Sequence, residues 1–348
     1  MEERSGYPML PLPRSDLLNV LYQHLPNKDT VLKLGTEVSD YEVSDEDVRV
    51  HLKDGTVVEG SIVVGADGVH SRVRGAMEKA RRKEIPSTPA TLMTASYQSI
   101  YALVPNRRGI KDGQLVEMRG SGHAVNVLAS PTQLMVILYR RLPTPTTAPV
   151  RYTIDEMDQF AESFMDMTVA PCVLFRDIWG DFDKKEARLV NQEEGVAKIW
   201  HHKRTVLLGD SACKMTSASG LGLNVGLDSA ALLASELQRC LVSNPDPDTR
   251  LLTDVFERCM YQRSREKECE RQFSFAYNTT RTITWSSWGY WIFDRFIFRL
   301  IGMEKVAATI YSMVSDGQIL SYVPFERRQT SIPWLRWPDV KPLIIERH

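Results

Sequence analysis

Residues 204–237, which read RTVLLGDSACKMTSASGLGLNVGLDSAALLASEL, decide the fold of this chain. Residues 205–208 are a short apolar run that predicts a buried strand, and Gly-Asp at residues 209–210 ends it with a turn. A glycine-rich bend over residues 220–226 leads into residues 227–237, where Ala and Leu predict a helix. The segment is therefore a strand, a bend and a helix.

The chemistry of this segment suits a flavin or a nucleotide. Asp210 lies at the carboxyl end of the strand, where ligands of open α/β sheets gather. Glycines let the main chain approach a ligand closely, and free amide groups at a helix start favour an anion or an electron-rich carbonyl. An ordinary tight strand-to-helix connection has the same spacing, so the spacing alone leaves both interpretations open.

A second strand, turn and helix are predicted at residues 61–74, SIVVGADGVHSRVR. Together the two motifs resemble those of the class A FAD monooxygenases, the flavoprotein aromatic hydroxylases, which carry GADGxxSxVR and a late GD followed by a Gly-rich bend and Asn. The matching positions are Gly65, Ala66, Asp67, Gly68, Ser71, Val73 and Arg74 in one motif and Gly209, Asp210, Gly220, Gly222 and Asn224 in the other. Cys213 and Ser217 depart from the family, which usually has His and Pro there.

The resemblance implies a set of cofactor-binding residues. It places Asp67 and Gly68 near the FAD pyrophosphate, and Asp210 on the ribityl chain. It also places the bend, with Gly220, Gly222, Leu223 and Asn224, against the isoalloxazine ring. Residues 14–25 predict a helix from the spacing of their leucines, and Arg14 heads it as an FAD-contacting Arg does in the family. A solvated Arg14 is the alternative, and no residue is singled out as catalytic.

The rest of the first half reads as β-structure. Residues 31–34, 36–43 and 47–52 predict short strands, with Asp54-Gly55 as a hairpin turn. Residues 94–142 predict a second sheet, which in the resembled family lies over the flavin and forms a wall of the substrate cavity. Tyr97, Tyr101, Tyr139 and Arg140 are candidate cavity residues, although alternation along a strand would also produce them for packing alone.

Composition excludes several classes of function. The 43 basic and 44 acidic residues leave no net field that would attract nucleic acid. Five scattered Cys without a CxxC pair argue against a disulfide framework and a zinc site, and the adjacent His201 and His202 point to opposite faces of a strand, so we expect no metal. No secretory signal follows Met1, which favours an intracellular protein, either cytoplasmic or peripherally bound to a membrane.

The C-terminal third differs in character. After Pro245 a long helical stretch, rich in charged residues, predicts a solvated helix face. Residues 282–302 then contain several Trp and Phe together with Asp294, Arg295 and Arg299. These three charges make the segment too charged to span a membrane. Residues 282–302 suit a helix at a membrane surface, the cap of an oily substrate tunnel, or plain core packing. A similar apolar part is found in the fungal branch of the resembled family that oxidises prenylated meroterpenoids and indole diterpenes.

One motif of the resembled family has no counterpart here. The family opens with a Rossmann βαβ unit that bears GxGxxG, and this sequence shows no such spacing after an initial strand. We therefore expect either a truncated gene model or a chain without its adenine-binding half, with weak FAD affinity.

These observations predict an α/β flavin-monooxygenase fold that lacks its first Rossmann βαβ unit and has a mostly antiparallel substrate-domain sheet and a helical C-terminal region. We expect a FAD-binding part over residues 1–85 and 186–245, a substrate sheet over 86–185 and a helical apolar region over 246–348. The implied reaction is FAD-dependent epoxidation or hydroxylation, with NADPH and O2, of an apolar prenylated, terpenoid or aromatic secondary metabolite. A cofactor-independent isomerase or cyclase, or a non-catalytic homologue, is the alternative.

Overall fold

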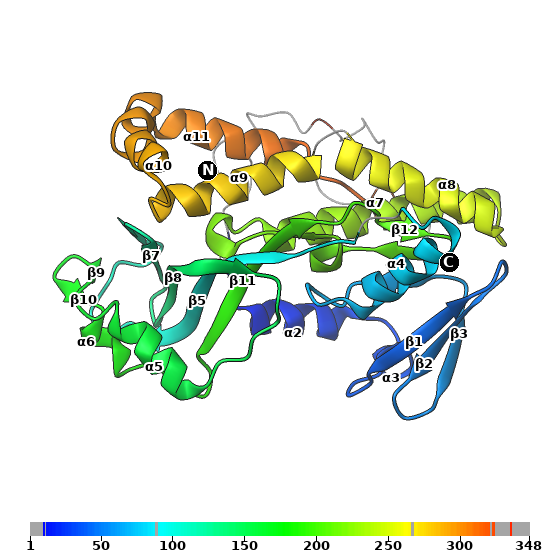
Figure 1. The fold of residues 1–348 in the computed structure, drawn as a ribbon, viewed down its shortest axis with the longest axis horizontal. Coiled ribbons are helices and arrows are strands. Elements are labelled where there is room, and N and C mark those ends of the chain that lie inside the picture. The colour runs from blue at the N-terminus through cyan, green and yellow to red at the C-terminus, as the bar shows by residue number, and fades with distance from the viewer. Residues whose placement is uncertain are drawn as a thin grey trace, which may run out of the picture.

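The computed structural model describes residues 10, 12–87, 90–265, 268–320, 322–323 and 335. Its largest sheet has six antiparallel strands in the order β14-β11-β5-β8-β7-β6 (Figure 1). They are β5 (Thr94–Pro105), β6 (Leu115–Gly120), β7 (His123–Ala129), β8 (Gln133–Thr146), β11 (Arg188–Val196) and β14 (Cys213–Lys214). The sheet predicted over residues 94–142 is thereby confirmed, and two strands from later in the chain extend it.

Side-chain alternation gives this sheet two different faces. On one face Ile100 and Val104 of β5 join the main core, where Phe160 and Phe164 are fully buried. That face is covered by a helical layer and a small hairpin: α5 (Ile154–Glu162), α6 (Arg176–Trp179), β9 (Thr168–Ala170) and β10 (Val173–Leu174). The helix α5 begins directly after Thr153 because Thr153 and Glu156 form a capping box. The other face of the sheet, with Tyr97 and Tyr101, is left for the bend and the C-terminal helices.

A smaller mixed sheet contains the strand of the segment at residues 204–237. Its order is β12-β13-β4, and β13 runs parallel to β4. The segment's helix begins at Gly222, before the predicted start at residue 227, because the bend itself enters the first helical turn. Val206 of β13 packs with Leu233 and Phe256 in a second core. The elements are β4 (Val63–Gly65), β12 (His201–His202), β13 (Thr205–Leu207), α4 (Arg72–Glu84), α7 (Gly222–Ser243), α8 (Thr249–Met260) and the 3-10 turns η1 (Gly209–Ser211) and η2 (Ser217–Ser219).

The N-terminal part confirms the predicted meander and helix, with one exception. The meander is β1 (Val38–Val43), β2 (Val48–Leu52) and β3 (Val57–Gly60), and the helix is α2 (Arg14–His24). The strand predicted at residues 31–34 is wrong, because α3 (Lys28–Val31) closes a helical turn there, with Leu32 N–H donating to the Lys28 carbonyl. A short apolar run does not by itself distinguish strand from helix.

The C-terminal helices lie along one side of the sheets, with α8, α9 and α11 in one layer (Figure 1). The elements after α8 are η3 (Tyr261–Arg265), α9 (Glu268–Ile283), α10 (Trp288–Ile292), η4 (Phe293–Ile297) and α11 (Phe298–Ser315), and η3 and η4 are π-helical. The prediction of a solvated charged face is wrong in part, because Arg263 and Glu268 are buried and form an ion pair at 2.8 Å. None of the described helices combines the length and apolarity needed to cross a bilayer.

The predicted division into parts meets one difficulty in the structure. β11 lies in the range 186–245 assigned to the FAD-binding part, yet it pairs with β5 along its length. We therefore propose to place the boundary after Val196. Residues 1–9, 324–334 and 336–348, at the two ends of the predicted division, lie outside the described residues.

Candidate functional site

Two turns with carboxylates lie at one edge of the small sheet. β4 and β13 are parallel neighbours, and Gly65 at the end of one is opposite Leu207 at the end of the other. The turn with Asp67 and Gly68 follows β4, and the turn with Gly209 and Asp210 follows β13. The chain thus brings the two predicted motifs to the same strand ends, where α/β proteins bind ligands.

Both oxygens of the Asp67 carboxylate accept hydrogen bonds from the start of its own helix, α4. Its Oδ1 accepts a hydrogen bond from Ser71 Oγ at 2.5 Å. Its Oδ2 accepts from the backbone N–H groups of Arg72 at 2.8 Å and Val73 at 3.1 Å. Gly68 takes a φ of +84°, the left-handed region that glycine adopts without strain. Asp67 therefore fixes the turn and the start of α4, and its predicted contact with the FAD pyrophosphate region stays a prediction.

Arg74 links the two turns by hydrogen bonds to a backbone carbonyl of each. Its Nη1 donates to the Ser211 carbonyl at 2.8 Å and its Nη2 to the Val69 carbonyl at 2.7 Å. Burial lowers the pKa of Arg74 from its ordinary value, and the nearby charges of Glu78 and Asp67 act in the opposite direction. An Arg stays protonated under such shifts, so Arg74 is a fixed cationic link that the GADGxxSxVR spacing contains but that sequence reasoning did not assign a role.

The start of α7 is open to a ligand. Gly220 has a φ of +68° and a Cβ added there would meet nothing within 4 Å. No side chain caps the helix at Gly222, and Leu223 is 56% exposed. Asn224 is exposed too, and its Nδ2 donates to the Gly220 carbonyl at 3.3 Å. Because the first N–H groups of a helix have no partner within the helix, this start can donate to a bound group.

The turn after β13 holds a partly exposed carboxylate beside that helix start. Gly209 has a φ of +58°, and a Cβ on Gly226 would lie 3.6 Å from the Gly209 Cα, so the two backbones meet closely. Asp210 Oδ2 accepts from Lys214 Nζ at 2.7 Å. An acceptor of hydroxyl protons, uncapped amides and unobstructed glycines are the groups that the polyol chain and carbonyl edge of a flavin require. The described residues therefore fit the flavin end of FAD.

Arg14 heads helix α2, as predicted. It is exposed in the first turn of α2, and none of that helix's residues is buried. Its predicted contact with FAD stays a prediction.

Three of the four candidate cavity residues share one face of the large sheet. Tyr97 and Tyr101 alternate along β5, and Tyr139 lies opposite Ser99 on β8. Tyr139 packs with Ala218 of η2, the turn that leads into the bend, which places η2 on this face. Arg140 is a correction: its guanidinium lies 4.3 Å from the ring centroid of Phe160, on the α5 side. Neighbours in a strand point to opposite faces, so Tyr139 and Arg140 cannot both line one cavity.

Ser217 joins the bend to this face through hydrogen bonds. Tyr101 OH donates to Ser217 Oγ at 2.6 Å, and Tyr139 OH lies 3.0 Å from the same atom. Gln192 Nε2 donates to Tyr101 OH at 2.5 Å, and the Ser217 N–H donates to Gln192 Oε1 at 3.1 Å. Burial raises the pKa of Tyr101 and, more strongly, that of Tyr139, so both phenols keep their protons. Sequence reasoning noted Ser217 as a departure but missed Gln192.

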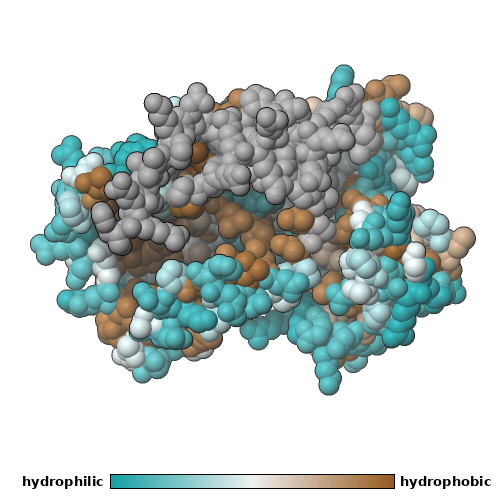
Figure 2. Space-filling model, turned by 180° about the vertical axis from the view of Figure 1, so that it is seen from behind, coloured by the Kyte–Doolittle hydropathy of each residue, from teal (hydrophilic) through white to brown (hydrophobic). Residues whose placement is uncertain are grey.

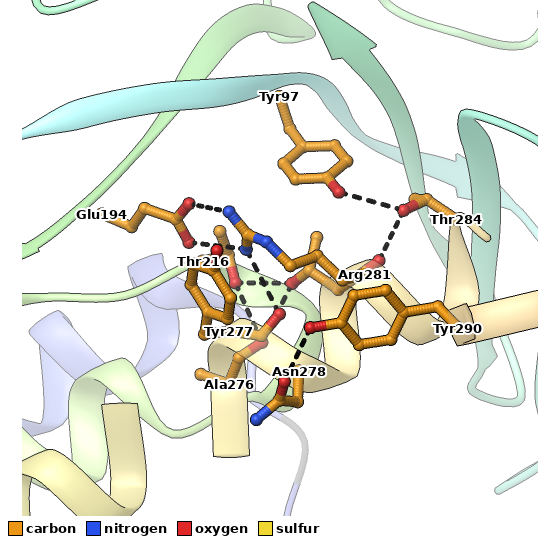
Figure 3. Close-up of polar contacts among 10 residues, drawn as sticks. Tyr97, Glu194, Thr216, Ala276, Tyr277, Asn278, Arg281, Thr284 and Tyr290 are labelled. Carbon is orange, nitrogen blue, oxygen red and sulfur yellow. Dashed lines mark hydrogen bonds and ion pairs between the residues drawn. The ribbon is translucent and has the colours of Figure 1, made fainter. Parts of the chain in front are cut away.

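Helix α9 contacts strand β11 and the residue before Ser217 (Figure 3). Arg281 donates to Glu194 of β11 from both terminal nitrogens, at 3.1 and 2.5 Å. Its guanidinium lies over the ring of Tyr277. Burial by itself would lower the pKa of Arg281, but the hydrogen bonds and charge of Glu194 outweigh it and leave the pKa above its ordinary value. In the residue directly before Arg281, Thr280 Oγ1 lies 2.6 Å from Thr216 Oγ1, beside Ser217.

Two further residues clarify the sequence predictions. Cys213 is buried, and the neighbouring Cys269 thiol and burial raise its pKa well above the ordinary value, so it is held as a thiol. Asp294, which the sequence analysis placed among the Trp and Phe of residues 282–302, is buried and pairs with Arg119 of β6. Trp285 Nε1 also donates to Asp294, at 2.7 Å. The C-terminal aromatic segment is thereby fastened to the large sheet.

Comparisons with known proteins agree with this architecture. The family model described as an FAD binding domain matches residues 1–258. The chain is 36% identical to the FAD-dependent monooxygenase srdH of Neurospora crassa, over 97% of this chain and 78% of the relative. It is 28% identical to the FAD-dependent monooxygenase andE of Emericella variicolor, over 94% of this chain and 70% of the relative.

Solved structures show the same fold at lower identity. Klebsiella pneumoniae HpxO, in complex with FAD and uric acid, superposes with a TM-score of 0.69 at 18% identity and covers 91% of this chain and 75% of its own. A salicylate hydroxylase with substrate gives a TM-score of 0.63 at 17% identity, over 87% of this chain and 74% of its own. The predicted α/β fold is thereby confirmed.

Proposed function

The chain belongs to the FAD-binding-domain family of FAD-dependent monooxygenases, and from this premise we propose that it oxygenates an apolar prenylated, terpenoid or aromatic secondary metabolite with NADPH and O2. The observation that carries the proposal is the uncapped start of α7 beside Asp210, at the strand ends where β4 and β13 stop. FAD, when bound, supplies the redox chemistry by taking reducing equivalents from NADPH and activating O2.

The chain's own residues bind and orient the cofactor in this proposal. The N–H groups at the start of α7 donate to the electron-rich edge of the isoalloxazine ring, and Gly220 and Gly222 let it approach. Asp210 accepts a hydrogen bond from the ribityl hydroxyls, in exchange for part of its contact with Lys214. Arg74 keeps the two turns in register without touching the ligand.

An apolar substrate is supported by the outer part of the large sheet. Direct cross-strand partners share a face, and one such row is entirely aliphatic or thioether: Leu103, Met135, Leu128 and Leu115. The next row inward contains Tyr101, and Tyr101 contacts Ser217 of the bend. Figure 2 shows apolar residues gathered in the middle of the face seen from behind. We propose that the apolar row contacts the substrate and excludes water near the site.

A membrane surface is the setting that we propose for this reaction. Trp288 is 79% exposed, Phe296 58% and Leu300 86%, which disfavours plain core packing for these side chains. Arg295 and Arg299 are exposed in the same segment. Aromatic and aliphatic side chains with basic neighbours suit an interfacial helix, where an apolar substrate would also concentrate.

The proposed function is tested by oxygen transfer. The purified protein would be supplied with FAD, NADPH and isotopically labelled dioxygen, and with a panel that contrasts geranyl-substituted phenols and indoles with sugars and short carboxylic acids. We expect one labelled oxygen atom in products from the apolar set, and NADPH oxidation that this set stimulates. Conversion that proceeds without FAD would point to the isomerase or cyclase alternative, and no labelled product from any compound would contradict the proposal.

A further inference from the structure

We propose that the Ser217 hydroxyl is a hydrogen-bond donor to an electron-rich oxygen or nitrogen of the bound ligand, held in position by Tyr101 and Tyr139. The inference rests on the proposed function and deepens it, because it names a binding residue that belongs to neither sequence motif's cofactor set. The acceptor can belong to the flavin edge or to the substrate, and the experiment below separates the two.

The orientation of Gln192 fixes the direction of the network. The Ser217 N–H donates to Oε1 of Gln192, so the other end of that amide, Nε2, is the group that faces Tyr101. Nε2 carries only protons and must donate. The Tyr101 oxygen accepts this bond and gives its own proton to Ser217 Oγ, at 2.6 Å.

A count of protons leaves one donor over. Three hydroxyl groups, those of Tyr101, Tyr139 and Ser217, make two oxygen-to-oxygen contacts with one another. The buried Ser99 hydroxyl also interacts with Tyr101, and it leaves this count unchanged because it donates its own proton to the Tyr101 oxygen. Two contacts use two protons. With the Tyr101 proton given to Ser217, the remaining proton belongs either to Tyr139 or to Ser217 and points away from the network.

Burial decides which hydroxyl has the spare proton. Tyr139 is 0% exposed and packs among Ala124 and Ile283. An unpaired hydroxyl proton there is unfavourable, because the buried group would lose its hydrogen bond to water without gaining another. Ser217 is partly exposed and opens the 3-10 turn that leads to Gly220 and the start of α7. Tyr139 therefore donates to Ser217, and the Ser217 proton is the one directed outward.

The position of Ser217 connects this donor with the ligand. The same side chain contacts β5 and β8 of the large sheet, while its turn ends where the open glycines begin. Thr216 is held by Thr280 of α9, and the Arg281–Glu194 pair holds α9 against β11. The donor is thus fixed from three elements at the junction between the flavin-binding bend and the apolar sheet face, where a preorganised polar group confers orientation.

The test compares Ser217→Ala and Ser217→Thr with the parent and with Ser229→Ala. Ser229 is a buried serine of α7 that bonds to its own helix at Val225, so its loss reports on general damage. Each protein would be titrated with FAD, following flavin fluorescence and the visible absorption band of the bound flavin. Each would also be titrated with a geranyl-substituted phenol and with the matching hydrocarbon that lacks the hydroxyl group.

If the acceptor is on the flavin, Ser217→Ala should weaken FAD about 3–10-fold and shift the bound flavin's absorption band, as loss of one neutral hydrogen bond implies. If it is on the substrate, the FAD constants should match and the phenol should lose about 3–10-fold while the hydrocarbon does not. Ser217→Thr should restore the parent values in either case. Unchanged FAD and phenol constants in a folded Ser217→Ala protein would overturn the inference alone, as would a Thr variant as impaired as Ala. If the parent protein binds no FAD, that result would instead contradict the proposed function.

Discussion

His201 is a buried histidine whose neutral form the fold requires. Burial, with the nearby charge of Arg81, lowers its pKa to about 4. Its ring lies 6.3 Å from that of Phe256, and its neighbour His202 faces Glu84 instead. The folded protein therefore binds a proton at His201 less readily than the unfolded chain does.

This difference predicts a pH-dependent stability. Between about pH 4 and 6.5 the unfolded chain binds more protons, so the free energy of unfolding should rise with pH across this window and level off above it. Across this window His201 changes the free energy of unfolding by about 3 kcal/mol. Urea unfolding of the parent and of His201→Phe at pH 5 and pH 7 measures it, with the exposed His70→Gln as control. We expect a smaller pH difference in His201→Phe only, and an equal difference in all three proteins would refute the assignment.

At this scale the sequence reveals residues whose partners are close along the chain. Asp67 and its helix cap lie within one motif, and so does the Asp210–Lys214 contact. Tyr101 and Ser217 are 116 positions apart, and Arg281 and Glu194 are 87 apart. No local spacing encodes such pairs, because only the strand order of the large sheet and the docking of α9 bring them together.

Among the elements, the segment from α10 to α11 makes the clearest prediction. It is fastened inward through Asp294 and Arg119, while Trp288 and Phe296 point outward. Burying two such side chains in an interface contributes several kcal/mol, at roughly 25 cal/mol per Å² of apolar area. The parent should therefore sediment with lipid vesicles, and more with anionic ones, because of Arg295 and Arg299.

The matched variants are Trp288→Ser with Phe296→Ser, and, as control, Val242→Ser at the exposed end of α7. The double variant should remain in the supernatant and keep the parent's circular dichroism, while the control sediments like the parent. If the parent stays in the supernatant with every vesicle composition, the membrane-surface interpretation of this segment is wrong. The segment would then be the cap of a substrate tunnel.

Element types were largely predictable from sequence, and their pairing was not. The meander follows from the hairpin turn signal and α2 from the spacing of its leucines. The exposed run at residues 31–34 does not form the predicted strand, because Val31 ends α3 and residues 32–34 belong to neither a helix nor a strand. β11 pairs with β5 although α5 and α6 lie between these two strands in the sequence. The pairing in the middle of the six-stranded sheet therefore cannot be predicted from adjacent segments.

For the molecule as a whole, the bend is the place where the two sheets and the C-terminal helices meet. Gly209 packs on Gly226, Ser217 bonds to the large sheet, and Thr216 bonds to α9. We propose that this junction is the flavin site, and that the two carboxylate turns take different parts in it. Asp67 stabilises its own helix, whereas Asp210 is partly exposed with one Lys as partner.

The dissociation constant of FAD for the parent, for Asp210→Ala and for the exposed control Asp254→Ala tests this account most directly. It would be measured by quenching of flavin fluorescence, with circular dichroism to show that each variant is folded. Loss of a hydrogen bond to a charged group implies about 1.5–3 kcal/mol, so Asp210→Ala should bind FAD about 10- to 150-fold more weakly than the parent and the control. Equal constants for all three folded proteins would contradict the placement of the flavin at this bend.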